Sequence, residues 1–220
     1  AIAWGSDPIS CRQPNDAEVT VSFYTSSGTV QPPEWTGKDV WNVLSNSVEN
    51  DSIDQPTLRD TNAYVSDGFL VASLPTFDAN DKKVLIQLNE RFGLALSGTR
   101  VVGKLDELLG AYRILGGTLA GTWRDRDFFT QVATIKDPLD DKKTVCTDNF
   151  LYPQVKGGFC DIADLAGNSA DLSGVCASTS IAMSFNAQEA RLGPITVLPP
   201  PNTSTCSATT NPAQDGCTKK

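Results

Sequence analysis

Alternation of apolar and polar residues is the commonest pattern in this sequence. Val19, Val21 and Phe23 alternate with polar residues over residues 17–24. Comparable segments follow at residues 68–74, 83–88, 92–104, 111–123 and 180–190. A period of two, carried by β-branched and aromatic residues, is typical of strands. Because short turns separate most of these segments, we expect them to pair antiparallel.

Two segments have apolar residues at helical spacing instead. The first covers residues 36–48, with Thr36 as its expected N-cap. The second covers residues 126–135, with Asp125 as its expected N-cap and Pro138 as the residue that stops it. We therefore expect two short helices packed on the strands.

Loops and a tail account for the remaining stretches. Residues 49–63 are polar and contain Pro56, so we expect a loop there. Residues 146–176 have little periodicity and three cysteines, which indicates a stapled, loop-rich region with one short helix near Asp161. Residues 198–220 contain a run of prolines followed by many Thr, Ser and Asn, a composition typical of a linker or tail.

Together these patterns predict a mainly β protein. We expect an antiparallel β-sandwich or open barrel over residues 17–197, with two short packed helices and disulfide staples. A polar N-terminal arm, residues 1–16, would precede it, and the Pro/Thr-rich tail, residues 198–220, would follow it. The 220-residue chain, with 40% hydrophobic residues, is long enough to bury a sizeable core.

The spacing of the cysteines indicates disulfides. None of them belongs to a C-x-x-C pair, and close pairs are usual in zinc and redox motifs. The six residues are Cys11, Cys146, Cys160, Cys176, Cys206 and Cys217. Disulfides persist outside the reducing cytosol, so we expect an extracellular, cell-surface or periplasmic protein.

The sequence leaves several pairings of these cysteines open. We expect Cys206 and Cys217 to bridge each other, which would close a short loop within the tail. Cys146 would then pair with Cys160 or Cys176, and the N-terminal cysteine with whichever of these is left.

The start of the chain agrees with export. It opens Ala1-Ile2-Ala3-Trp4, with neither an initiator methionine nor a basic segment, as expected after removal of an export signal. No stretch reaches the roughly 18 consecutive apolar residues of a membrane span, so we expect no transmembrane segment.

Charge and histidine content exclude several classes of function. The chain has 18 basic and 26 acidic residues, a net charge of −8, whereas nucleic-acid binding requires basic surface that displaces counterions from phosphates. It contains no histidine, which excludes Ser-His-Asp and Cys-His catalysis and histidine-ligated zinc. An enzyme built on this sequence would depend on carboxylates, Tyr, Lys, Ser or a bound hard cation.

A series of motifs marks the C-terminal half. GGTLAGTWRDRDFF occupies residues 116–129, and Cys176 precedes SIAMSF at 180–185 and LGP at 192–194. This series resembles uncharacterised exported lipoprotein-type proteins of gliding Gram-negative bacteria, in which a strand ending in Gly-x-Trp meets a helix. The resemblance implies a cell-surface or periplasmic location and carries no known activity. The chain departs from that pattern because Cys11 lies too far from the start to be a lipidated N-terminal cysteine.

Asp125 and Asp127 are the first candidates for chemistry, because carboxylates are the natural acid–base groups in a chain without histidine. A glycosidase needs two carboxyl groups facing each other across a sugar, often beside an aromatic residue such as Trp123. Asp125 is also explained as a helix cap, and Asp127 as a first-turn charge that interacts favourably with the helix dipole. We favour this structural interpretation over a catalytic one.

Two oxygen-rich turns are candidate calcium sites. Calcium takes six to eight oxygen ligands, which Asp and Asn supply. Neither turn follows the EF-hand order, and such turns are common for local hydrogen-bonding reasons. The candidate ligands are Asp78, Asn80 and Asp81 in the first turn and Asp137, Asp140 and Asp141 in the second.

The tryptophans are candidates for stacking on a glycan. Trp41 and Trp123 lie in periodic segments and are expected in the core. Trp35 follows Pro32-Pro33-Glu34 and is the tryptophan that we expect to be exposed.

These observations favour a structural or interaction protein, a subunit of a larger extracellular assembly that binds a protein partner or itself. The tail would act as a tether, and an edge strand at 17–24 or 180–190 would pair with a neighbouring subunit. The alternative is a carbohydrate-binding module or a carboxylate-based glycan hydrolase. A glycan binder would expose a row of aromatic residues on one sheet face, and a hydrolase would add a cleft with two carboxyl groups about 5–10 Å apart.

Overall fold

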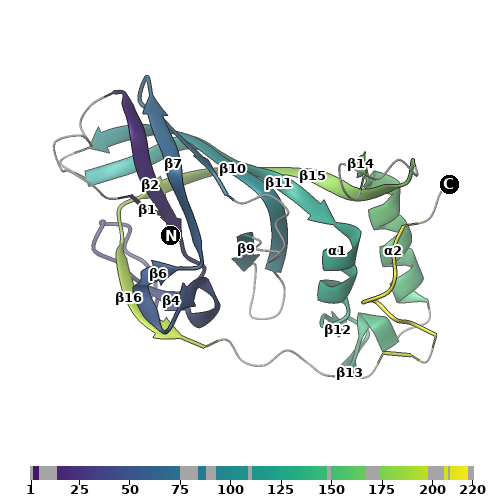
Figure 1. Ribbon diagram of the computed structural model, residues 1–220. Helices are drawn as coiled ribbons and strands as arrows, with labels where there is room; N and C mark the ends of the chain where they lie inside the picture. The colour runs from purple at the N-terminus through teal and green to yellow at the C-terminus, as the bar shows by residue number, and fades with distance from the viewer. Residues whose placement is uncertain are drawn as a thin grey trace. The chain divides into compact units, whose positions relative to one another are not determined.

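The computed structural model describes residues 2–4, 14–74, 84–87, 93–108, 111–147, 150–166, 174–197, 206–207 and 209–217. Within these residues the protein is mainly β, as the sequence predicted, with mostly antiparallel sheets, two α-helices and disulfides. The chain divides into two compact units, which are described separately below (Figure 1). Unit 1 comprises Ala1–Val84, Ser97–Gly121 and Ala182–Leu198, and unit 2 comprises Leu85–Leu96, Thr122–Ile181 and Pro199–Lys220.

In the described part of the chain, the largest sheet has nine strands and is open. Its order is β1-β2-β7-β8-β10-β11-β15-β14, with β9 paired to β10. All six segments whose alternation predicted strands belong to it. Its strands are β1 (Ile2–Trp4), β2 (Asp16–Phe23), β7 (Leu58–Ser66), β8 (Phe69–Ser73), β9 (Val84–Gln87), β10 (Gly93–Leu108), β11 (Ala111–Arg124), β14 (Leu165–Ala166) and β15 (Cys176–Gln188). The expected edge strands, β2 and β15, each lie between two neighbours in this order.

In unit 1, one face of β2, β7, β8 and β10 is buried. Phe23 opposes Leu58 across β2 and β7, and Val65 opposes Leu70 across β7 and β8. Burying a large apolar side chain of this kind stabilises the fold by about 1.5–3 kcal/mol. The most buried apolar residues of this face are Val21, Ala63, Leu70, Ala72 and Val101, and Ile114 of the neighbouring β11 is equally buried.

A smaller sheet in unit 1 overturns the first expected helix. Its order is β16-β4-β3, from β3 (Ser26–Gly28), β4 (Val40–Leu44) and β16 (Arg191–Thr196), and β4 runs parallel to β16. The helix expected over residues 36–48 is therefore wrong: a strand is followed there by a short 3₁₀ turn, Ser45–Ser47. The apolar spacing suits a helix, but pairing with a strand from far along the chain decides the local structure.

The loop expected over residues 49–63 is also wrong. β5 (Val48–Glu49) and β6 (Ser52–Pro56) form a hairpin whose turn residues, Asn50 and Asp51, have φ angles of 52° and 50°. Two successive positive φ angles are what a two-residue type I′ hairpin turn requires, and Asn and Asp tolerate them.

β7 follows that hairpin, and one polar residue on its buried side explains why its alternation was missed. Asp60 is only 8% exposed. Its carboxylate accepts hydrogen bonds from the backbone N–H groups of Asn62 at 2.8 Å and Ser73 at 2.6 Å. These bonds compensate the lost hydration of the carboxylate.

Unit 2 is built around two helices, α1 (Asp125–Val132) and α2 (Leu151–Ile162). α1 confirms the helix expected over 126–135, and α2 includes the position near Asp161 where a short helix was expected. Arg124, rather than Asp125, occupies the N-cap position of α1, and it makes no side-chain capping bond. A hairpin of β12 (Lys136–Asp137) and β13 (Asp140–Thr144) lies between the helices in sequence.

Aromatic rings pack between the two helices. Phe128 of α1 stacks on Phe159 of α2 with ring centroids 4.3 Å apart, and Trp123 meets Phe128 edge-on at 4.8 Å. Phe129 is fully buried and contacts Phe159 and Tyr152. Such pairs add about 0.5–1.5 kcal/mol each beyond the area they bury, so this cluster is the core of unit 2.

The disulfides correct the expected pairing. Cys146 bonds Cys206 and Cys160 bonds Cys217, so Cys206 and Cys217 do not bridge each other. Cys176 is a free, exposed thiol, and the N-terminal cysteine lies outside the described residues. The expectation failed because it paired cysteines that are near in sequence, whereas the fold brings the chain end onto α2 and the turn that precedes it. The C-terminal segment thus belongs to unit 2, and residues 17–197 are divided between the two units.

Candidate interaction surface

Part of the exposed side of the sheet in unit 1 is apolar. Tyr64 of β7 opposes Val71 of β8, and Val71 opposes Val102 of β10, so these three side chains form one row across three strands. Phe69 lies two residues from Val71 and therefore on the same side. We call Tyr64, Phe69, Val71 and Val102 the outer face.

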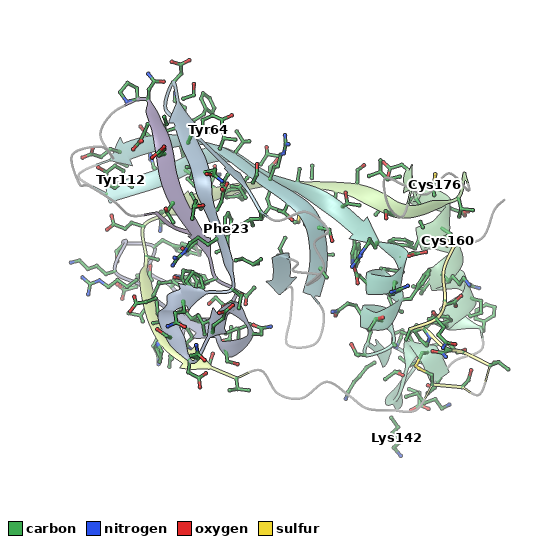
Figure 2. The ribbon with its side chains drawn as sticks, viewed as in Figure 1. Phe23, Tyr64, Tyr112, Lys142, Cys160 and Cys176 are labelled. Carbon is green, nitrogen blue, oxygen red and sulfur yellow. A yellow bond between two sulfur atoms is a disulfide. The ribbon has the colours of Figure 1, made fainter. Side chains whose placement is uncertain are left out.

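The exposure of these residues is large for apolar side chains within a sheet. Tyr64 is 43%, Phe69 44% and Val102 38% exposed, and Val71 is half-buried. Leu115 of the neighbouring β11 is 39% exposed. Figure 2 labels Tyr64 together with Phe23, a residue of the opposite, buried side of the sheet. Contiguous apolar patches of this kind, rimmed by polar residues, mark interaction sites.

Charged side chains border the outer face on two sides. Arg100 and Lys104, both exposed, lie two residues on either side of Val102 in β10. Glu18 of β2, also exposed, lies at the opposite edge beside Tyr64. Apolar surface with a charged rim is the usual composition of a protein–protein contact.

The structure places Trp35 as expected. It is 61% exposed and contacts Trp41, which is half-buried, with ring centroids 5.9 Å apart. Its φ of 57° is rare for a bulky residue. Trp123, by contrast, is buried at 8% exposure, as expected of a core residue.

A cavity of about 340 Å³ lies beside the Trp35 loop. It is lined by residues flanking both tryptophans, including Glu34, Thr36, Val40 and Asn42, but by neither indole ring. Asp39 lines it as well, and its carboxylate accepts the Glu34 N–H at 2.8 Å, which fixes the loop. Cavity and indole rings therefore do not form one stacking site.

The carboxylate pair of α1 has structural partners. Asp125 accepts the backbone N–H groups of Arg126 at 2.6 Å and Cys217 at 3.0 Å, which holds the C-terminal segment against the helix. Asp127 is 9% exposed and forms an ion pair with Arg124 at 3.0 Å. Both carboxylates thus have structural partners, but the capping role expected of Asp125 is wrong: its carboxylate anchors a distant segment instead.

A second anchor holds the same segment on α2. Asp215 forms an ion pair with Lys156 and accepts a hydrogen bond from the Tyr152 hydroxyl at 3.2 Å. Burial, reinforced by the negative charge of Asp215, raises the pKa of Tyr152 above its ordinary value. These residues line a cavity of about 290 Å³ together with Pro153, Thr209 and Thr210, so its charged groups are already paired.

The two candidate calcium turns differ in what the structure describes. Asp78, Asn80 and Asp81 lie outside the described residues. In the second turn Asp137 accepts the Leu139 N–H at 2.7 Å, and Asp140 pairs with Lys143 at 3.1 Å; the side chain of Asp141 is not described. Among the described residues no three metal-ligating side chains cluster. Calcium binding stays a prediction.

Comparisons with known proteins give this chain no relatives. No protein-family model, no curated protein and no solved structure matches it. Within the described part of the chain, neither helix has the length and apolar character needed to cross a membrane. The fold and the surface therefore define a class only: a disulfide-bonded, mainly β protein with an exposed apolar sheet face.

Proposed function

We propose that this chain is an exported interaction protein that acts outside the cell, at the cell surface or in the periplasm, as a subunit of a larger assembly. It uses the outer face to bind another protein. One observation carries the proposal: two aromatic and two β-branched side chains form a contiguous apolar patch on a sheet whose other side already holds the core of unit 1.

The chemistry of the outer face favours a protein over a glycan as its ligand. Sugars are recognised by an aromatic ring combined with several neutral hydrogen-bonding groups. Here Val71 lies opposite Tyr64, Ser66 is the neutral polar residue opposite Phe69, and Arg100, Lys104 and Glu18 place charges at the rim. Aliphatic and aromatic residues surrounded by charge match the centre and rim of a protein interface.

Export is supported by the cysteines. Cys146–Cys206 and Cys160–Cys217 are formed in the structure, with Cα atoms 4.9 Å and 5.4 Å apart. Stable disulfides that link distant parts of a chain are expected outside the reducing cytosol.

Site-specific photo-crosslinking in the exporting cell tests this function. The photoreactive residue p-benzoylphenylalanine would replace Phe69 on the outer face and, as a matched control, Phe150, which is 72% exposed in unit 2. We expect one discrete protein adduct from position 69 and none from position 150. The absence of an adduct at position 69, or equal adducts at both positions, would reject the outer face as the binding surface.

Carbohydrate binding is a second candidate. Tyr64 and Phe69 are exposed aromatic residues on one sheet face, as a glycan binder would have, and Trp35 is exposed in a backbone conformation that bulky residues rarely adopt. Affinity electrophoresis in gels containing neutral polysaccharides tests it, with Trp35→Ala and Tyr64→Ala as separate variants. Unchanged mobility of the wild-type protein in every gel would eliminate this candidate.

A further inference from the structure

We infer that the outer face binds the outer face of a second copy of this chain. The inference rests on the proposed function, because it names the partner of the same surface. It is carried by the distribution of charge: the acidic residue of the rim lies at one edge of the face and the two basic residues lie at the other.

The strand register places these charges. A bulge in β2 puts Ala17 and Glu18, both exposed, opposite Tyr64 of β7. The row then continues through Val71 to Val102. Glu18 therefore lies at one end of a cross-strand row and Val102 lies at the other.

The basic end of the row is available for a partner. Arg100 and Lys104 flank Val102 on the same side of β10, and both are exposed. Among the described residues, neither of them forms a salt bridge, and neither does Glu18. The next acidic residue of β10, Asp106, is bonded to Arg113, with 2.7 Å between Nε and Oδ2.

A twofold axis in the interface, parallel to the strands, makes this arrangement self-complementary. Such an axis reverses the strand order, so that β2 of one copy faces β10 of the other and β7 faces β8. Glu18 then faces the gap between Arg100 and Lys104 of the second copy, and Tyr64 packs on its Phe69 and Val71. The strands of the two sheets remain roughly aligned, which is a common way for sheets to pack face to face.

The size of the face determines how strong this association can be. Four strands at about 4.8 Å spacing and five residues at about 3.4 Å cover roughly 19 by 17 Å in projection. A stable interface takes about 800 Å² from each partner, which is more than this area supplies. We therefore expect a reversible dimer with a dissociation constant in the micromolar to millimolar range.

Sedimentation equilibrium of the purified, oxidised full chain, up to about 1 mM, tests the inference by charge exchange. Glu18→Lys alone and Lys104→Glu alone should each weaken dimerisation on the order of tenfold, since a surface ion pair is modest but occurs twice in a symmetric dimer. The double variant carrying both changes should recover part of the lost affinity, because the two exchanged charges attract each other again while Arg100 still opposes the changed position 18. Glu49→Lys and Lys142→Glu, exposed and outside the face, are controls with the same changes of charge.

Three results would overturn the inference: a monomer at every concentration, equal weakening by the controls, or no recovery in the double variant. Because all four positions are exposed, unchanged far-UV circular dichroism is expected and shows that each variant folds. Failure here is distinguishable from failure of the proposed function. A monomer that still gives an adduct at position 69 with a different protein keeps the interaction function and rejects only the second copy as its partner.

Discussion

Replacing Cys160 and Cys217 together by serine removes one of the two covalent links that hold the C-terminal segment on unit 2. The two disulfides span sequence separations of 60 and 57 residues and overlap along the chain. When one disulfide is intact, the loop that the other closes no longer runs along the whole intervening chain. It runs from position 146 to 160, through the intact disulfide, and from position 206 to 217, which is about 25 residues for either disulfide. In the chain-entropy model a loop of that length contributes about 3.5 kcal/mol.

The loop lengths therefore predict that removing either disulfide costs the same free energy of unfolding. The burial of the cysteines makes the two losses differ. Cys146 is fully buried and contacts Thr144, whereas Cys160 is half-buried. Serine at position 146 places a hydroxyl in the core, which adds about 1 kcal/mol to the loss. We expect Cys146→Ser with Cys206→Ser to be the more destabilising pair.

Hydrogen exchange followed by mass spectrometry measures the protection of backbone amides in unit 2 separately from those in unit 1. A loss of about 3.5 kcal/mol corresponds to a roughly 400-fold fall in protection of the amides of α2. Peptides from β7 and β8 in unit 1 are the internal control and should be unaffected. The reasoning is refuted if either pair changes the protection of α2 less than about fivefold, or if the Cys160 pair is the more damaging one.

Four further substitutions test the packing and electrostatics. Phe129→Ala should cost about 3–5 kcal/mol in urea unfolding, because the ring is fully buried among aromatic residues. Gly103→Ala should cost about 1–3 kcal/mol, because its methyl group would overlap Ile114, whereas Gly157→Ala, with open space in α2, should stabilise by about 0.5–1 kcal/mol. The raised pKa of Tyr152 means that its stabilising contribution is complete below pH about 10 and declines at higher pH. Tyr152→Phe should remove that alkaline decline of the thermal midpoint.

The sequence pattern correctly predicted the strands in which apolar and polar residues alternate, because that alternation itself determines which side is buried. β2 and β8 each place apolar residues on the buried side at a period of two, so their strands could be predicted. β4 could not, because Val40, Trp41 and Leu44 fit a helix equally well. Its structure is decided by pairing with β16. At Gly193 of β16, a side chain would collide with Val40 and the Trp41 backbone.

The disulfides and the contacts of Asp125 likewise depend on residues far apart in the sequence, which the local pattern does not reveal. Asp125 was recognised as a residue with a structural role, but its contact with Cys217 joins positions far apart in the sequence. The pairings of Cys206 and Cys217 depend on the same folding back of the chain end. The spacing of cysteines in the sequence does not predict these pairings. The entropic cost of closing a loop grows only slowly with its length, so a distant cysteine is nearly as available as a near one.

The sequence of β8 contains an indication of the outer face, namely apolar residues on both sides of the strand, which a search for apolar–polar alternation overlooks. β8 reads Phe69, Leu70, Val71, Ala72, so apolar residues occupy both of its sides. A strand of that kind is expected to be covered on both faces. The chain buries Leu70 to 1% and Ala72 completely but leaves Phe69 44% exposed. The sequence of β8 suits a strand with two covered faces, whereas the described residues of this chain cover one of them. This difference is the strongest physical reason to look for the second layer in another molecule.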